Sequence, residues 1–238
     1  MPINLLKKLL LLLLPFSLFI RAETSSSENQ KYIDEIIYSE IRTALFSIKE
    51  IEEKIIETVE DNGFEKEFSK SWVKSRIKEA YQELLTESKN WKSPTDVELL
   101  SKAFNELAKD GIIALHNAGY DSSEGIDEVQ EIVTKLKKKS IKKPIGYCFY
   151  HQQDLERAIL PTHSNLYLSF NTLKNISDKD TIKLGQKIVK ILENYHFKIN
   201  WNETVNTKIE ILNFKWQKLY NPDLDLTDHT QVIKLLPH

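Results

Sequence analysis

Residues 146–159 read GYCFYHQQDLERAI, and the organisation of the chain follows from this stretch. It begins with an aromatic run at residues 147–150, which is typical of a buried strand because aromatic side chains fit a pleated, half-buried surface. Polar residues take over at His151, and apolar residues return at helical spacing from Leu155. The sequence therefore predicts that a strand ends and a helix begins near His151, with no loop between them.

Strand-like and helix-like segments alternate on both sides of this junction. The pattern predicts strands over residues 112–116, 145–150 and 166–170, and helices over residues 126–138, 154–160 and 180–195. Two further strands, 197–201 and 208–214, are joined by the turn-rich segment NETVN and are expected to be antiparallel. Alternation of this kind is typical of α/β layers. Residues 111–220 are therefore predicted to form an α/β or α+β domain that ends in an antiparallel strand pair.

Residues 32–110 are expected to be all-helical. The first helix carries apolar residues in alternating steps of four and three and stops at residues 61–63; a second is expected over 65–87, and a third begins at Thr95 or Asp96 and ends at Gly111. The apolar seam of the first helix fits either the chain's own second helix or a helix-mediated dimer. Its members are Ile37, Ile41, Ala44, Ile48, Ile51 and Ile55.

The two ends of the chain have their own compositions. Lys7 and Lys8 precede an apolar run at residues 9–20, and Ala22 is a small residue before a polar stretch, which is the layout of a secretory signal. The run is shorter than a membrane span, so a signal peptide over 1–22, cleaved after Ala22, is favoured over a shallow uncleaved anchor. A linker follows at 23–31, and residues 221–238 are expected to be an irregular tail. The mature protein is thus predicted to be exported, periplasmic or secreted, without a stable membrane anchor.

Composition excludes some classes of partner. The 238 residues carry a formal net charge of −2, which argues against a nucleic-acid surface because such surfaces need a concentrated basic field. The lysines at 137–143 are interpreted as a solvated helix end rather than as an anion site. With the single cysteine Cys148, no internal disulfide can form. Its place within the aromatic strand predicts a small buried hydrophobic residue rather than a reactive thiol.

The second half of the chain resembles a family of domains of unknown function. The resemblance is carried by GYCFYHQQDLERAI, by LYLSFN at residues 166–171 and by WNETVNTKIEI at residues 201–211, and it covers roughly residues 110–220. It implies no particular activity. Some members of that family carry a cysteine-rich segment where this chain has residues 116–125. Because this chain has no cysteine there, the resemblance gives no support for a metal or redox role.

Polar residues follow three of the predicted strands. If these strands are parallel, their ends share one edge of the sheet, where ligands settle in open α/β folds. The alternative is that these residues are helix caps and turn residues. The candidates for binding a protein or a small-molecule ligand are Asn117, Asp121, Gln152, Arg157 and Asn171, together with His116 and His151.

Catalytic patterns are weak. The sequence contains no GxSxG, GxGxxG, phosphate-loop or HExxH motif. His151 and Asp154 are spaced as a base and its orienting residue, with His116 as a third group. Arg157 is spaced to pair along the helix with either Asp154 or Gln153. No metal site and no cofactor is predicted. Two functions remain: a non-catalytic exported binding domain, which is favoured, and a small hydrolase or transferase that uses His151, Asp154 and His116.

Overall fold

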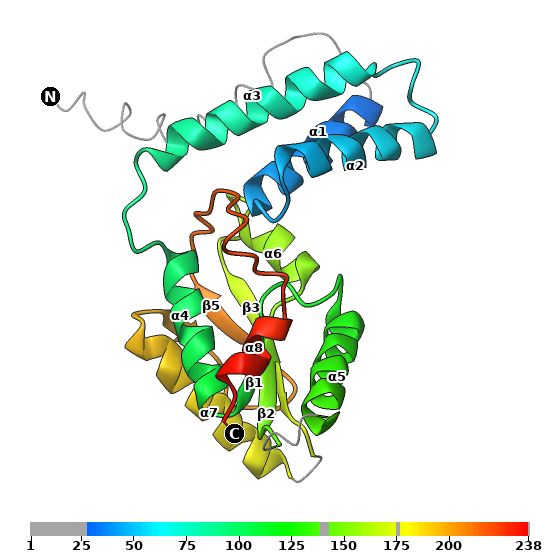
Figure 1. The fold of residues 1–238 in the computed structure, drawn as a ribbon. Helices are drawn as coiled ribbons and strands as arrows, with labels where there is room; N and C mark the ends of the chain where they lie inside the picture. The colour runs from blue at the N-terminus through cyan, green and yellow to red at the C-terminus, as the bar shows by residue number, and fades with distance from the viewer. Residues whose placement is uncertain (1–27, 139–142, 175–176, 238) are drawn as a thin grey trace, which may run out of the picture.

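The computed structural model describes residues 28–138, 143–174 and 177–237. The predicted signal peptide and most of the predicted linker lie outside the described residues. Figure 1 shows a helical bundle above an α/β domain. The helices are α1 (Glu28–Thr43), α2 (Ile48–Asp61), α3 (Lys70–Ser88), α4 (Asp96–Lys109), α5 (Ser122–Lys138), α6 (Gln152–Ala158), α7 (Asp178–Asn194) and α8 (Thr230–Leu235); the strands are β1 (Ile112–Leu115), β2 (Gly146–Phe149), β3 (Leu166–Thr172), β4 (Lys198–Asn200) and β5 (Ile209–Leu212). No helix among the described residues is long and apolar enough to cross a membrane.

The predicted first helix is in fact two helices. The chain breaks at Ala44, which has a left-handed backbone angle φ of 50°, and restarts at Ser47. There the side chains of Ser47 and Glu50 form a capping box, in which each side chain binds the backbone of the other residue. Helices α1, α2 and α3 share one core that contains Ile37, Ile51 and Ile55. The apolar seam is therefore packed inside this chain.

The five strands form one mixed sheet with the order β1-β2-β3-β5-β4. Strands β1 and β2 are parallel, whereas β3 is antiparallel to β2 and β5 is antiparallel to both β3 and β4. This confirms the predicted α/β domain and its antiparallel C-terminal pair. Because β3 is not parallel to the first two strands, however, the three polar strand ends do not meet at one edge.

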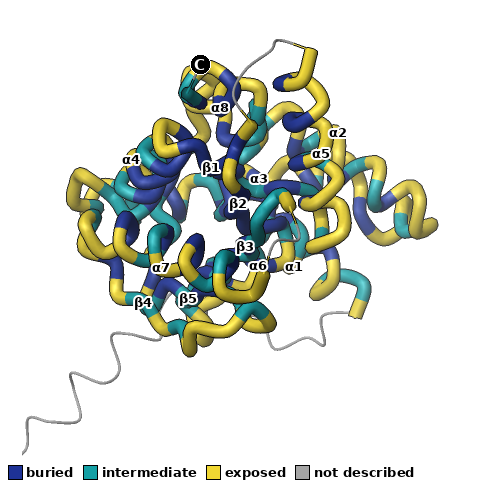
Figure 2. Tube along the Cα trace, turned by 90° about the horizontal axis from the view of Figure 1, so that it is seen from below, coloured by how far each residue is buried: buried dark blue, intermediate teal, exposed yellow. Residues whose placement is uncertain are grey.

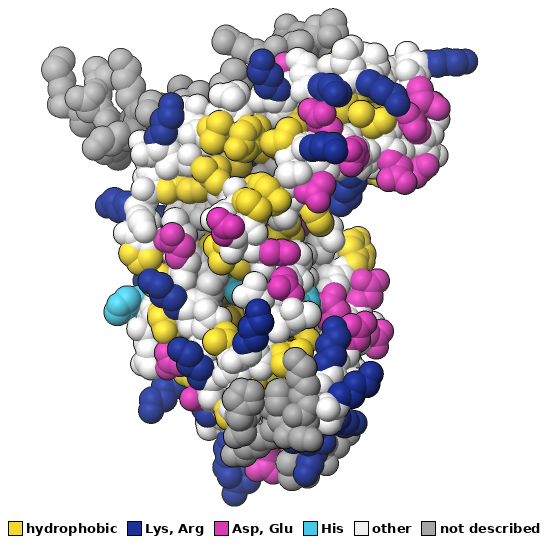
Figure 3. Space-filling model, in the orientation of Figure 1, with side chains coloured by type: hydrophobic (Ala, Val, Ile, Leu, Met, Phe, Trp, Pro, Cys, Tyr) yellow, Lys and Arg dark blue, Asp and Glu magenta, His cyan; other side chains and the backbone are white. Residues whose placement is uncertain are grey.

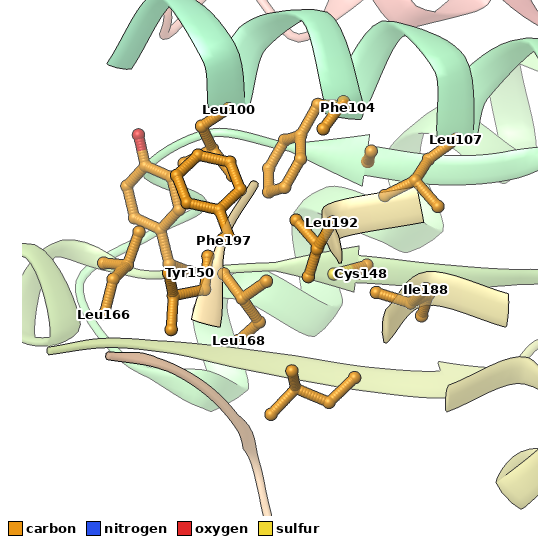
Figure 4. Packing of buried hydrophobic residues seen from close by; sticks show 14 of the residues in the cluster. Leu100, Phe104, Leu107, Cys148, Tyr150, Leu166, Leu168, Ile188, Leu192 and Phe197 are labelled. Atoms are coloured by element: carbon orange, nitrogen blue, oxygen red, sulfur yellow. The ribbon is translucent and has the colours of Figure 1, made fainter. Parts of the chain in front are cut away.

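Two helical layers cover the sheet. Helices α4 and α7 pack with Cys148, Tyr150, Leu168 and other residues on one face (Figure 4), and α5 and α8 pack on Phe149 and its neighbours on the other. Figure 2 shows the buried residues concentrated along β1, β2 and β3 between these layers. Cys148 is fully buried, as its aromatic surroundings predicted.

Two predicted boundaries need correction. Helix α4 was assigned to the helical N-terminal region, but its Leu100, Phe104 and Leu107 belong to the core of the sheet. The helices before residue 110 are α1 to α4, as predicted, but the two hydrophobic cores separate before α4, at residues 89–95. The predicted irregular tail also contains α8, which buries Val232 and Ile233 against the other face of the sheet. The cause is the same for α4 and α8. The periodicity of the sequence identifies the apolar face of a helix, but it does not identify the element against which that face packs.

The end of α1 joins the bundle to the α/β domain. The Trp216 ring nitrogen Nε1 donates a hydrogen bond of 3.0 Å to the carbonyl oxygen of Thr43, and Lys218 Nζ donates one to the carbonyl oxygen of Ala44. A cation is favourable there because the last carbonyls of a helix carry partial negative charge. Burial nevertheless lowers the pKa of Lys218 to about 8. Figure 3 shows hydrophobic side chains gathered on this face where the bundle meets the domain.

Limited trypsin digestion should cut first between α3 and α4. Lys92 and its neighbours Ser93 and Pro94 are exposed there, and the bundle and the sheet have separate cores. The two fragments should stay together, because Trp216 and Lys218 still bind the end of α1. Gel electrophoresis followed by size-exclusion chromatography measures both outcomes, with Lys92→Gln as the control that slows the cut. First cleavage near residue 110 would contradict the boundary given above.

Candidate functional site

The junction between β2 and α6 holds a closed polar cluster. His151 is the N-cap of α6, and its ring nitrogen Nδ1 accepts a hydrogen bond of 3.3 Å from the backbone N–H of Asp154. In return the His151 backbone N–H donates to Asp154 Oδ2 at 3.4 Å. The sequence prediction that a helix begins at this residue is therefore confirmed, in the form of a capping box.

Lys208, just before β5, completes the cluster. Its Nζ atom lies 2.9 Å from Asp154 Oδ1 and 2.7 Å from Oδ2, and 2.9 Å from His151 Nε2. His151 Nε2 is also 3.1 Å from Asp154 Oδ2. The side chain of Asp154 is 2% exposed, that of His151 is 6% exposed and that of Lys208 is 30% exposed. The cluster thus ties the end of β2 and the start of α6 to the start of β5.

The hydrogen bonds of His151 determine where its proton lies. A backbone N–H can only donate, so Nδ1 must be the unprotonated nitrogen that accepts from Asp154. In the neutral ring the proton is then on Nε2, where the carboxylate of Asp154 can accept it. Burial lowers the pKa of His151; the Asp154 charge raises it and the Lys208 charge lowers it. Neither ring nitrogen is therefore free to take a proton from a substrate unless the cap breaks.

His116 belongs to a different environment. It stacks on Phe104 of α4, with ring centroids 4.5 Å apart, and its Nδ1 lies 3.2 Å from the hydroxyl of Tyr150. His151, the N-cap of α6, has Asp154 and Lys208 as its partners and shares neither of them with His116. Burial, together with the charges of His229 and Lys218, lowers the pKa of His116 to about 3. The structure thus separates His116 from the pair of His151 and Asp154.

A second ionic contact involves the C-terminal segment. His229 Nε2 donates to the carbonyl oxygen of His116 at 2.6 Å, and His229 Nδ1 forms an ion pair with Glu128 Oε2 on α5. Both ring nitrogens face oxygen atoms, which favours the doubly protonated imidazolium. Burial alone would lower the pKa of His229, but Glu128 and the His116 carbonyl outweigh it and raise the pKa.

Three further candidates, Asp121, Gln152 and Asn117, lie near these clusters in the chain. Asp121 Oδ1 accepts the backbone N–H groups of Ser123 and Glu124 at the start of α5. Gln152 Nε2 donates to Glu156 at 2.7 Å. Asn117 has a left-handed φ of 45°, and its buried Oδ1 has no hydrogen-bond partner among the described residues.

Arg157 and Asn171 depart from their predicted places. Instead of pairing with Asp154, Arg157 places its guanidinium carbon 5.9 Å from the ring centroid of Tyr167. Asn171 pairs with Tyr147 at the start of β2, so it lies near one end of this strand, whereas His151 follows the other end. Its Oδ1 accepts from the backbone N–H of Thr172 at 2.7 Å. The antiparallel direction of β3 is the reason that Asn171 does not join the other candidates.

Sequence reasoning missed three residues that the structure brings into these clusters. Lys208 was part of a predicted strand and had no visible partner, because Asp154 is 54 positions away. His229 lay in the tail that was expected to be irregular, and Glu128 was one of many acidic residues on a predicted helix. A lysine at the start of a strand carries no distinctive pattern, so no local signal could have found it. Within the described residues, no three His, Cys, Asp or Glu side chains are grouped closely enough to hold a metal ion.

Comparison with known families gives one match. The profile of a family described as a domain of unknown function, DUF6891, matches residues 26–220. The chain belongs to this family. The match confirms the resemblance seen in the second half and extends it over the helical bundle, and it ends before α8. No curated protein and no solved structure matches the chain.

Removing the two charges of the cluster should have unequal costs. Lys208→Met leaves the Asp154 carboxylate buried without its cation, and we expect a loss of about 3 kcal/mol of unfolding free energy. Asp154→Asn leaves the ammonium of Lys208, which reaches water, and should cost only about 1 kcal/mol. Urea unfolding measures both values. The double variant should lose less than the sum of the single variants, and simple additivity would contradict the ionic link.

The contact of His229 should make stability depend on pH. Because the folded protein raises the pKa of this histidine above 6.5, its contribution is complete below about pH 6.5 and is lost as the pH rises through the folded-state pKa. Glu128 and Asp225 favour its charge, and the neighbouring His116 stays neutral. Urea unfolding of wild type and His229→Gln from about pH 6 to about pH 9 tests this. The difference between the two should shrink at high pH; a constant difference would contradict the prediction.

Proposed function

We propose that this DUF6891 protein is an exported, non-catalytic protein that binds a partner. The observation that carries the proposal is the saturation of His151: its Nδ1 caps α6 and its Nε2 faces Asp154 and Lys208. A general base needs a nitrogen lone pair within reach of a substrate proton. Here the only unprotonated nitrogen is committed to the backbone of α6.

The position of His116 gives the same answer. A hydrolase or transferase built on His116, His151 and Asp154 would need the three side chains around one pocket. His116 is stacked on Phe104 of α4 and faces the Tyr150 hydroxyl, whereas His151 contacts Asp154 and Lys208. Their separation supports binding over the catalytic alternative.

Export rests on the first 22 residues, where two lysines, an apolar run and Ala22 follow one another. The mature protein should begin near Glu23 and be found outside the cytoplasm. Mass spectrometry of the native protein from fractionated cells measures both properties. An intact Met1 in the cytosolic fraction would overturn the export part of the proposal.

The binding part is tested by cross-linking in the exported fraction, followed by mass spectrometry. Wild type and His151→Asn should capture the same partner, because an asparagine oxygen can still accept the backbone N–H of Asp154 and maintain the cap. The melting temperature of each variant controls for folding. Conversion of a substrate by wild type, but not by a folded His151→Asn protein, would overturn the proposal in favour of an enzyme.

A further inference from the structure

A groove runs between α7 and the outer edge of the sheet. Its volume is about 270 Å³, and β4 is the last strand in the sheet order. Strand β4 pairs with β5 on one side, and no described strand pairs with it on the other. The groove therefore lies beside a strand edge whose backbone groups can still pair. It is lined by Gln186, Val189, Lys190 and Glu193 from α7, and by Ile199, Trp201 and Glu203 from β4 and the turn after it.

The helix contributes one continuous face to this groove. Its four lining residues are spaced by three, one and three positions, so they project from the same side of α7. The opposite side of α7 is buried in the core through Ile188, Ile191 and Leu192. The groove is thus bounded by a helix that the core holds in place, which gives a preformed site rather than one that must be assembled on binding.

Trp201 forms a fixed wall of the groove. Its indole lies against Gly185 of α7 so closely that a Cβ atom at Gly185 would come within 2.3 Å of the ring. It also meets Phe170 edge-on at a centroid distance of 5.3 Å, and its Nε1 donates to the Thr204 carbonyl oxygen at 3.1 Å. Trp201, Val189 and Ile199 are the apolar residues of the lining.

We propose that this groove binds an extended peptide segment of a partner protein, which adds a strand to the free edge of β4. The inference rests on the proposed binding function and names its site and the chemistry of its partner. Strand addition supplies backbone hydrogen bonds, while pockets beside the edge select every second side chain. The volume lies just below the roughly 300–1,000 Å³ of drug-sized ligand sites. It therefore suits one or two apolar side chains.

The charged residues that line the groove favour particular residues of the peptide next to the apolar side chain that enters it. Glu193 and Glu203 give two negative charges against the single positive charge of Lys190. Gln186 donates to Glu203 at 2.8 Å and fixes that carboxylate at one end. A basic residue next to the apolar one therefore complements the rim.

The test selects binders from a phage-displayed library of random heptapeptides on the full chain. Wild type should enrich sequences with an apolar residue beside Lys or Arg. In Val189→Arg the long side chain fills the groove. The affinity for a selected synthetic peptide, measured by calorimetry, should fall at least about tenfold. Glu193→Lys should weaken it about threefold, and Glu57→Lys, an exposed change on α2, should leave it unchanged.

A chemical variant of the peptide separates strand addition from simple pocket binding. N-methylation of alternate peptide bonds removes donors but keeps the side chains, and in the pairing register it should weaken binding at least about tenfold. Equal binding of the methylated peptide would overturn strand addition. Circular dichroism checks that Val189→Arg is folded. If that variant does not fold, the affinity of Glu193→Lys for the peptide still tests the inference, because Glu193 is exposed.

Three other results would overturn the inference: no enrichment on wild type, equal binding to Val189→Arg, or a dimer in solution that Val189→Arg abolishes, which would assign the groove to a second copy. These failures differ from failure of the proposed function. A partner that still cross-links to Val189→Arg leaves the binding function standing with another surface. Substrate turnover that depends on His151 would remove the binding function itself.

Discussion

The burial of β2 between β1 and β3, and its direct continuation into α6, is the constraint on which the remaining structure depends. Cys148, Phe149 and Tyr150 are fully buried, with alternate side chains in the two cores on either face of the sheet. Only Tyr150 and His151 separate the strand from the helix. The first N–H groups of α6 find acceptors at once: those of Gln152 and Gln153 donate to the carbonyl oxygens of Gly119 and Tyr120, and that of Asp154 donates to the His151 side chain. Moving this junction by one residue would exchange the two faces.

The cluster at this junction explains why residue types common in active sites form a structural element here. A buried carboxylate is costly unless hydrogen bonds and a countercharge compensate it. Asp154 obtains both from the backbone of His151 and from Lys208. The histidine is held by Asp154, whose backbone N–H donates to Nδ1 and whose carboxylate lies 3.1 Å from Nε2. The contacts that stabilise the cluster therefore also leave it without a free base. A buried histidine or carboxylate is therefore not reactive by virtue of its burial alone. Its hydrogen-bond partners determine whether a lone pair is left for a substrate.

Helix α7 connects the core to the surface proposed for binding. Its inner face packs with α4 and β3, and its outer face forms one wall of the groove beside β4. Because the inner face is fully packed, the outer wall is rigid, and Trp201 lies against it at Gly185. The bundle of α1, α2 and α3 is attached elsewhere, through Trp216 and Lys218 at the end of α1. The groove and the bundle therefore use different parts of the α/β domain.

The sequence by itself determined the elements and their local ends. Aromatic and apolar periodicity predicted the strands and most helices, and the polar residues at His151 and Thr95 marked helix starts that the structure confirms. These signals are local, because caps and periodicity involve residues within one or two turns. Ala44 shows the limit even here, since a heptad-like seam concealed a break between two helices.

Only the tertiary structure decided which elements meet. Helix α4 packs on the sheet, and β3 is antiparallel to β2, so that Asn171 lies away from His151. Lys208 and His229 contact residues that are far away in the chain. Such contacts depend on the packing of whole faces, and the residues that make them carry no local pattern. The hydrophobic pattern does not encode the direction of a strand. Because β3 runs antiparallel to β2, the polar residues at the end of β3 lie at the other end of the sheet from the polar residues after β1 and β2.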